Sequence, residues 1–343
     1  MTDSQQHETT FVYQSNTTAE ALAQQLQTAG DVLLITHTKP DGDAIGSCLA
    51  MHRSLRQLGV SSRVLLAGPI DPNLASLVGE KDHVNTIEDV GLPEKDPERI
   101  LILDTGAWSQ LEPFADWLRE RHEKVLGIDH HARGGDVASM RLVDVSAASA
   151  TQASVPVIDA MGVDLSCEGI ADALFVGLAT DTGWFRFSSA GPEVFRLAAR
   201  LLEAGADKDE LYSRIEQQSS PSRMAIQGRA LLSLRLVKDG AYALMRLDPN
   251  DFAETGARLE ELAGIVNEPM EIGSVRASIL FVEFEVGTTK LSFRSKPASG
   301  GQPGVDVNEL AAHFGGGGHV HAAGARIAGS IDEAIRQVEA ALA

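Results

Sequence analysis

The sequence has little cysteine, little positive charge and no long apolar run. Only two cysteines, Cys48 and Cys167, occur among 343 residues. Both lie in apolar patterns with helical spacing, so we expect buried thiols in a reducing cytoplasm and not a disulfide framework. No apolar run approaches the roughly 18 residues that a membrane helix requires. The polar residues 1–10 also lack the apolar core of a signal peptide. These absences favour a cytoplasmic protein without a membrane partner.

Basic residues are scarce relative to acidic ones. The chain has 29 Lys and Arg against 48 Asp and Glu, a formal net charge of −19, and no block of basic residues. Long nucleic acids are bound mainly through basic surface and counterion release, so this balance argues against duplex DNA as a partner. It is compatible with a short anionic substrate, although acidic composition more commonly serves solubility.

An apolar, strand-like run over residues 32–36 ends abruptly in polar residues. His37, Asp41 and Asp43 follow it, and Gly46 and Ser47 then open an apolar stretch of helical spacing. Two unpaired carboxylates beside a buried strand would repel each other and resist desolvation. A divalent cation removes that cost, so this loop is a candidate metal site.

Two further strand-like runs end in residues of the same kind. Residues 99–103 are followed by Asp104, and residues 124–128 by Asp129-His130-His131. In open α/β sheets ligands lie beyond the carboxyl ends of the strands, so we expect these side chains at one edge. A helix-like stretch over residues 167–180 supplies a last acid. The predicted metal ligands are His37, Asp41, Asp43, Asp104, His130 and Asp181.

The composition of this ligand set indicates a metal and a reaction. Carboxylates mixed with two imidazoles suit Mn²⁺, or alternatively Co²⁺ or Fe²⁺, better than an all-oxygen Mg²⁺ site or a thiolate zinc site. Six ligands are too many for one ion that also needs open positions, so we predict two divalent ions bridged by Asp104. Two such ions can hold a phosphoryl group and activate water, which makes phosphoester hydrolysis the expected reaction.

Each motif has a plainer interpretation when it is taken alone. His37 could bond to backbone at a strand end, and Asp104 could cap a helix. Asp41 and Asp43 could form a turn. The convergence of four motifs at strand or helix ends favours the metal site over these separate explanations.

The neighbours of His130 receive different roles. Asp129 is expected to orient a ligating histidine and not to bind metal itself. His131 lies beside a ligand on a loop and could contact the substrate or its leaving group.

The order of the elements predicts an α/β fold. Strand, helix and strand alternate at the spacing of a doubly wound parallel sheet with right-handed crossovers. We expect disorder over residues 1–15, a catalytic domain over 16–206, a helical connector over 207–236 and a smaller α/β domain over 237–343. In that last domain we expect strands at 241–247, 274–286 and 290–295, helices at 252–266 and 307–314, then a strand and a terminal helix from Ile331.

A glycine run near the C-terminus has two possible interpretations. Gly315-Gly316-Gly317-Gly318 could be a flexible linker. Alternatively its backbone N–H groups could cradle a phosphate, with His319 as an added donor. Arg294, on a predicted strand, could grip the same phosphate with two hydrogen bonds.

These residues resemble the DHH phosphoesterase family, which is named for the triplet seen here as Asp129-His130-His131. The run from His37 to Ser47 looks like its first motif, and Asp104 matches the second. Ala179-Thr180-Asp181-Thr182-Gly183 with Phe185-Arg186-Phe187 looks like the fourth. Gly315-Gly316-Gly317-Gly318-His319 and Phe293-Arg294-Ser295 are similar to the DHH-associated C-terminal domain.

Within this family, a bare two-domain chain is most similar to the bifunctional oligoribonucleases and 3′-phosphoadenosine 5′-phosphate phosphatases, the nanoRNase type. The resemblance implies Mn²⁺-dependent trimming of very short single-stranded RNA to mononucleotides, a substrate cleft between the domains, and a homodimer. It implies catalytic roles for Asp104, Asp129, His130 and His131, and substrate binding by Arg294, Gly316, Gly317, Gly318 and His319.

The chain departs from the family pattern at one place. Relatives carry a Ser-Thr-x-Glu-like helix start after the third motif, whereas residues 149–153 read Ser-Ala-Thr-Gln-Ala. No metal ligand is lost, but helix capping or nearby substrate contacts are expected to differ.

Other functions compete with the oligonucleotide enzyme. A cyclic-dinucleotide phosphodiesterase, acting on cyclic di-AMP or its linear dinucleotide, uses the same core. A non-catalytic nucleotide-binding regulator would show erosion of the ligand set, and all six ligands are present. A single-strand DNA exonuclease of RecJ type would require an additional domain and a basic track, and a related pyrophosphatase would not carry the glycine-rich domain.

Overall fold

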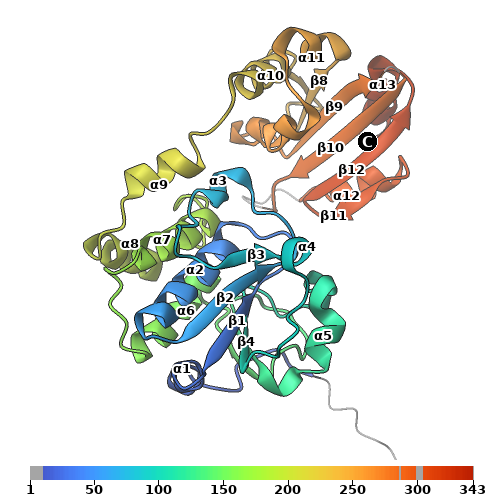
Figure 1. Ribbon diagram of the computed structural model, residues 1–343. Coiled ribbons are helices and arrows are strands. Elements are labelled where there is room, and N and C mark those ends of the chain that lie inside the picture. Colours follow the sequence, from blue (N-terminus) through green and yellow to red (C-terminus); the bar gives the residue numbers. More distant parts are fainter. Residues whose placement is uncertain (1–10, 286, 299–303, 343) are drawn as a thin grey trace, which may run out of the picture. The chain divides into compact units, whose positions relative to one another are not determined.

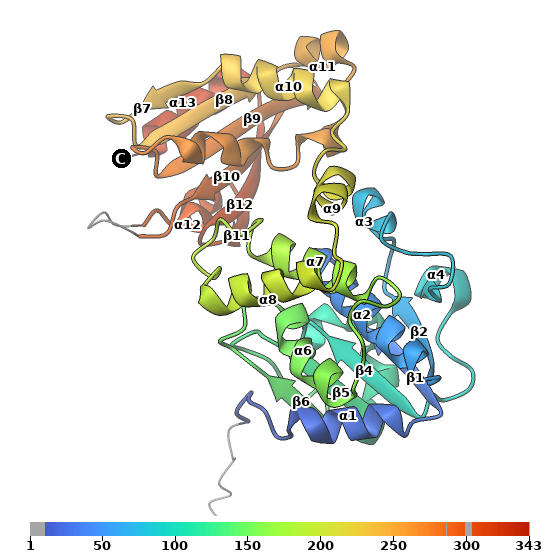
Figure 2. The same cartoon turned by 90° about the vertical axis from the view of Figure 1, so that its left-hand side faces the viewer.

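The computed structural model describes residues 11–285, 287–298 and 304–342. The chain divides into two compact units between Gln218 and Ser219 (Figures 1 and 2). This division falls inside the connector that we predicted over residues 207–236. Helix α9 (Lys208–Ile215) belongs to the first unit, and α10 (Pro221–Leu232) belongs to the second.

The first unit is built on six parallel strands. They are β1 (Asp31–Ile35), β2 (Ser61–Leu66), β3 (Val84–Thr86), β4 (Arg99–Leu103), β5 (Val125–Asp129) and β6 (Met140–Val143). Their order is β3-β2-β1-β4-β5-β6, and every neighbouring pair is parallel. This confirms the predicted doubly wound sheet. The strand order reverses between β1 and β4, and α/β sheets bind ligands outside such a reversal.

Helices cover both faces of this sheet (Figure 2). On one face α1 (Ala19–Gln27), α2 (Gly42–Gln57), α6 (Ala150–Ala160) and α7 (Ile170–Asp181) bury a continuous apolar core, and α8 (Pro192–Glu203) and α9 pack against α7. On the other face α5 (Ala115–Arg119) covers a smaller core. Two short helices, α3 (Pro72–Ala75) and α4 (Ile87–Val90), flank β3. The central strands are buried on both faces because of this double cover, which is why they are almost entirely apolar in sequence.

Two expectations for the first unit need correction. Cys48 is buried in α2, but Cys167 is only partly buried and lies in the turn before α7. Residues 1–10 lie outside the described part of the chain, whereas residues 11–16, which precede α1, are held against β6. Ser15 Oγ donates to the Val143 carbonyl oxygen at 3.0 Å, where disorder had been expected.

The second unit contains a separate six-stranded sheet. Its strands are β7 (Arg235–Val237), β8 (Tyr242–Leu247), β9 (Ala277–Glu285), β10 (Thr288–Ser295), β11 (Gly317–His319) and β12 (Ala322–Ala328). The order is β11-β12-β10-β9-β8-β7, and all pairs are antiparallel except β8 with β9. Helices α12 (Val307–Ala312) and α13 (Ile331–Ala341) cover one face.

The opposite face of this second sheet is only partly covered. Helices α10 and α11 (Pro249–Thr255) and the 3₁₀ turns Leu259–Leu262 and Ile265–Glu271 pack over β8 and β9. The single helix predicted over residues 252–266 is therefore wrong. Gly256 adopts a left-handed φ of 69° and ends α11, because this conformation stops a helix. The predicted glycine loop is likewise partly a strand, β11.

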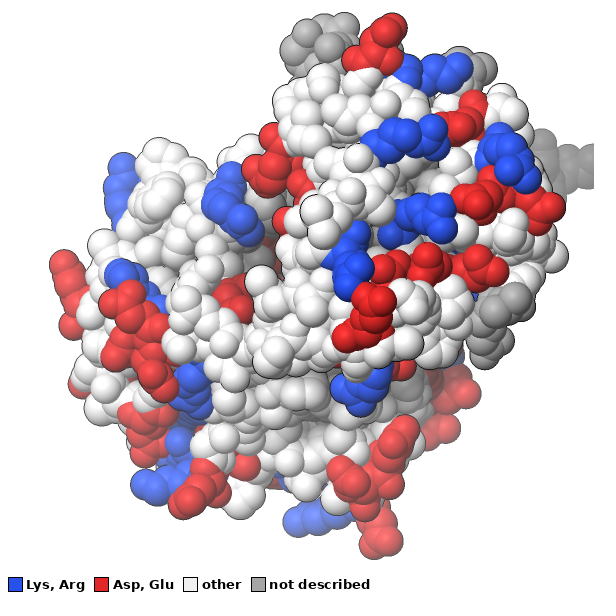
Figure 3. Space-filling model, turned by 90° about the horizontal axis from the view of Figure 1, so that it is seen from above, with Lys and Arg blue, Asp and Glu red and all other residues white. Residues whose placement is uncertain are grey.

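None of the helices in the described ranges combines the length and the apolar character needed to cross a bilayer. Lys and Arg side chains are interspersed with Asp and Glu over the face drawn in Figure 3.

Candidate metal centre

Three strand ends bring the central side chains together. His37 follows β1, Asp104 follows β4, and His130 follows β5. Thr36 Oγ1 donates to the Leu103 carbonyl oxygen at 2.8 Å, which ties the ends of β1 and β4 together. The candidate site thus lies at the reversal of strand order, where the sequence predicted it.

Asp104 is the centre of this arrangement. Its carboxylate lies 3.4 Å from His37 Nε2 and 3.4 Å from His130 Nε2, through different oxygens. The residue is 3% exposed and adopts a left-handed φ of 62°. No hydrogen-bond donor reaches its buried Oδ1 within the described chain. A buried carboxylate oxygen without a donor is costly unless a cation completes its surroundings.

Close packing of α2 against α7 places Asp43 at the same point. A Cβ on Gly46 would lie 2.5 Å from the Ala173 carbonyl oxygen, so glycine permits this approach. The Asp43 carboxylate, 1% exposed, accepts hydrogen bonds from the amides of Ala150 at 2.5 Å and Thr151 at 2.9 Å. These amides begin α6, and a helix N-terminus favours a negative charge.

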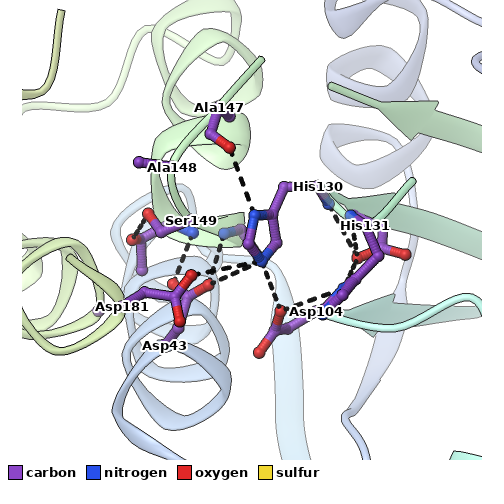
Figure 4. Close-up of polar contacts among 12 residues, drawn as sticks. Asp43, Asp104, His130, His131, Ala147, Ala148, Ser149 and Asp181 are labelled. Atoms are coloured by element: carbon purple, nitrogen blue, oxygen red, sulfur yellow. Dashed lines mark hydrogen bonds and ion pairs between the residues drawn. The ribbon is translucent and has the colours of Figure 1, made fainter. Parts of the chain in front are cut away.

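His130 faces a ring of carboxylates (Figure 4). Its Nε2 lies 3.4 Å from Asp104, 3.5 Å from Asp181 and 3.9 Å from Asp43. Its Nδ1 lies 3.4 Å from the Ala147 carbonyl oxygen, which favours the tautomer with the proton on Nδ1. Nε2 then presents its lone pair to the carboxylates, as a metal ligand requires.

Asp41 occupies two roles. Asp41 is the N-cap of α2, and its side chain accepts hydrogen bonds from the amides of Asp43 and Ala44. This capping role needs no metal ion. Asp41 also falls in one of three groups whose ligand atoms lie within 4.8 Å of one another: His37 with Asp41 and Asp104, Asp43 with His130 and Asp181, and Asp104 with His130 and His131. All six predicted ligands belong to these groups.

Electrostatics make this cluster a good fit for cations. Burial, followed by the charge of Asp104, raises the pKa of Asp43 well above its usual range. Burial also raises the pKa of Asp181. Burial opposes the charged form of His130, but the carboxylates of Asp104 and Asp43 outweigh it and raise its pKa to about 9. Without a metal ion, protons must therefore balance the excess negative charge, and bound divalent ions would replace them.

Asp129 lies outside these groups and positions the loop. Its Oδ1 accepts from His131 Nδ1 at 2.7 Å and from the amides of His130 and His131. Tyr13 donates its hydroxyl to Asp129 Oδ2 at 2.5 Å. Sequence reasoning missed Tyr13, because it lies in an irregular N-terminal segment. Its ring occupies space left by Gly106 and Gly134, where a Cβ would come within 2.0 and 2.5 Å of it.

Two of the predicted substrate-binding residues of the second unit, Arg294 and His319, share one sheet face. In the strand register, Arg294 pairs with Ala322, and Ala322 pairs with His319. Directly paired residues point to the same side of a sheet, so Arg294 and His319 form a single cross-strand row. Gly316 is packed against β12, where a Cβ would lie 2.2 Å from the Gly324 carbonyl oxygen. Gly318 donates its amide to Asn308 Oδ1.

The unusual segment at residues 149–153 caps its helix normally. Ser149 Oγ accepts from the amide of Gln152, and Gln152 Oε1 accepts from the amide of Ala148 at 2.8 Å. The Gln152 side chain therefore satisfies the amide of Ala148, one residue before the N-cap, and not the amide of Ser149 as in a capping box.

Comparison with known proteins identifies relatives for both units. The DHH family, N-terminal domain, matches residues 31–178, and the DHHA1 domain matches residues 239–343. The bifunctional oligoribonuclease and PAP phosphatase NrnA of Thermus thermophilus is 32% identical over 90% of this chain and 88% of its own length. Its namesake in Bacillus subtilis is 25% identical over 89% and 91%. A crystal structure of an exopolyphosphatase-related protein from Bacteroides fragilis superposes with a TM-score of 0.79 at 26% identity, covering 94% of this chain and 95% of that one.

Proposed function

The chain belongs to the DHH family, and from that premise we propose that it hydrolyses very short oligoribonucleotides to mononucleotides and 3′-phosphoadenosine 5′-phosphate to AMP. The observation that carries this proposal is the grouping of two histidines and three carboxylates around the buried Asp104, whose Oδ1 has no hydrogen-bond donor within the described chain. The names of the two relatives support the choice of substrates.

We assign two divalent ions to the cluster, with Mn²⁺ as the preferred metal. One would be held by His37, Asp41 and Asp104, and the other by Asp43, His130 and Asp181, with Asp104 shared. The mixed imidazole and carboxylate set supports Mn²⁺ over Mg²⁺. When bound, the ions would supply Lewis-acid stabilisation of the charge on the transferred phosphoryl group.

The chain's own residues then orient the substrate. Asp129 accepts from His131 Nδ1, and this hydrogen bond raises the pKa of the half-exposed imidazole. The protonated ring can therefore donate from Nε2 to a phosphate or leaving oxygen. In the second unit, Arg294 and His319 would bind a phosphate from one sheet face. We further propose a cytoplasmic homodimer that does not bind duplex DNA.

Digestion of three substrates in the presence of Mn²⁺ tests this function. The substrates are an RNA of two to five nucleotides, 3′-phosphoadenosine 5′-phosphate and cyclic di-AMP, with products separated by chromatography. Mononucleotides from the RNA and AMP from the bisphosphate are expected. Turnover of cyclic di-AMP or its linear dinucleotide alone would instead identify a cyclic-dinucleotide phosphodiesterase. Bound metal with no turnover of any substrate would point to a nucleotide-binding regulator.

A further inference from the structure

The second sheet has an open face that carries more positive charge than phosphate binding by Arg294 alone requires. On β10, Leu291 and Phe293 are buried against α12 and α13, so Lys290 and Arg294 point to the opposite side with Ser292. The partner positions on β12 are Arg326, Gly324 and Ala322. The open face is therefore defined by three rows: Lys290 with Arg326, Ser292 with Gly324, and Arg294 with Ala322.

The first of these rows places two cations directly opposite each other. Lys290 and Arg326 are register partners in an antiparallel pair, and both are exposed. Among the side chains that the structure describes, no carboxylate forms an ion pair with either of them or with Arg294. Like charges in directly opposed positions destabilise a sheet. In a chain with a net charge of −19, acidic partners are abundant, so this unpaired row indicates a site for an external anion.

Two hollows adjoin this row and share Lys290. One, of about 220 Å³, is lined by Lys290, Ser292 and Arg294 on one side and has Leu280 and Val282 among its apolar lining; Glu260 is its only acid. The other, of about 350 Å³, is lined by Lys290, Arg326 and the backbone of Gly315, Gly316 and Gly324. The cations thus border two hollows in the surface, and small residues between the rows leave the sheet open to close approach.

We propose that the Lys290–Arg326 row binds a backbone phosphate of the RNA substrate other than the one bound by Arg294, and so favours strands of several nucleotides over dinucleotides. This inference rests on the proposed function. Lys290 and Arg294 are four residue steps apart on β10, about 13 Å along the backbone at the rise of an extended strand. A row of cations spread over that length of strand fits an RNA strand with successive phosphates better than a single phosphate ion.

The test compares Lys290→Gln/Arg326→Gln with the wild type in the full chain. In Mn²⁺, the double variant is expected to raise the KM for a five-nucleotide RNA several-fold, while kcat and the KM for a dinucleotide stay unchanged. Arg336→Gln is the matched control, because this exposed cation lies on α13, which covers the other face of the sheet. Equal shifts for both RNA lengths, or no shift for either, would overturn the inference.

Direct binding separates this inference from the proposed function. Anisotropy of a fluorescent five-nucleotide RNA, measured in EDTA over a range of salt, needs no turnover. Each lost phosphate contact should reduce the slope of log affinity against log salt by about 0.7, the value for single strands. Suppose that the wild type hydrolyses no RNA, but the double variant binds the RNA more weakly and with a smaller salt slope than the wild type. In that case only the proposed function fails. Unchanged binding and slope would overturn the inference whatever the activity.

Thermal stability distinguishes a binding role from a structural one. Because the row brings like charges together, neutralising Arg326 is expected to leave the melting temperature equal or higher. A clear drop in melting temperature for both Arg326→Gln and Lys290→Gln would show that these side chains support the fold, and would contradict the inference.

Discussion

Asp104 combines a strained backbone with an unsatisfied side chain. A left-handed conformation at a non-glycine residue costs on the order of 1–3 kcal/mol, and such strain persists mainly at functional sites. Its amide donates to the Ile128 carbonyl oxygen at 3.0 Å, so the flanking strands hold the conformation in place. The surrounding sheet thus holds this carboxylate between His37 and His130, within reach of both rings.

Replacing Asp104 with asparagine should abolish Mn²⁺-dependent hydrolysis, because an amide cannot bridge two cations as a carboxylate does. Asparagine tolerates left-handed φ, so the backbone should be preserved. In metal-free buffer the variant should melt lower than the wild type. Burial raises the pKa of Asp104, but the contacts with His130 and His37 outweigh it and hold this pKa below its usual range, so the charged carboxylate stabilises the fold. Turnover retained at wild-type level in Mn²⁺ would contradict the bridging role.

His52 provides a pH-dependent contribution to stability away from the metal cluster. The ring is buried between α2 and β2; its Nδ1 lies 2.8 Å from Ser62 Oγ, and its Nε2 accepts from the amide of His83. Burial lowers its pKa to about 4, although the nearby carboxylate of Asp82 opposes this. The folded state therefore holds a neutral ring, whereas the unfolded chain takes up a proton near pH 6.5.

The stability that His52 contributes should be complete above about pH 6.5 and lost as the pH falls toward 4, because the unfolded state then binds more protons. The full shift corresponds to roughly 3 kcal/mol. Urea unfolding at pH 7 and pH 4.5 would measure it, with His52→Gln as the variant that cannot titrate. Parallel losses of unfolding free energy in the two proteins would refute this role for His52.

At the scale of elements, the contact between α2 and α7 sets the position of two candidate acidic ligands. Asp43 lies in the first turn of α2, and Asp181 is the last residue of α7. Gly46 and Gly177 allow these helices to approach closely, and a Cβ on Gly177 would lie 2.7 Å from Asp43 Oδ1. The two glycines therefore help to position the candidate ligands, although they supply no ligand atom themselves.

Gly46→Ala should force the two helices apart. Overpacking of this kind typically costs about 1–3 kcal/mol, and the displacement of Asp43 should also weaken Mn²⁺ binding. Gly228→Ala on α10 is the matched control, since no atom lies within 4 Å of its Cβ. That control should gain about 0.5–1 kcal/mol through helix propensity. Denaturant unfolding and Mn²⁺ titration would measure the unfolding free energy and the Mn²⁺ affinity of both variants. Equal values for the two variants would contradict the role assigned to helix packing.

Elements with continuous apolar sequences could be predicted, and weak ones could not. The central strands β1, β4 and β5 are apolar apart from one charged end residue each, and they were predicted within about a residue. The edge strands β3 and β6 are short and half-buried, so they lack that signal. The helix expected after Phe252 ends early at Gly256, which a periodic pattern does not reveal.

At the scale of the whole molecule, strand topology explains why the grouping of the candidate ligands could be predicted. Parallel strands share one edge for their carboxyl ends, so residues far apart in sequence meet without any need to know side-chain packing. Tyr13 and the Lys290–Arg326 row could not be found this way. The first depends on an irregular segment crossing the sheet edge, and the second on a strand register that residue spacing alone does not fix.

The chain belongs to the DHH family and is organised in two units. The proposed chemistry depends on how many metal ions this chain binds. Native mass spectrometry of the full chain equilibrated with Mn²⁺, with Asp104→Asn measured in parallel, tests that property most directly. We predict two Mn²⁺ ions per wild-type chain and fewer in the variant. A wild-type chain that binds one ion or none, or a variant that still binds two with equal affinity, would contradict the account.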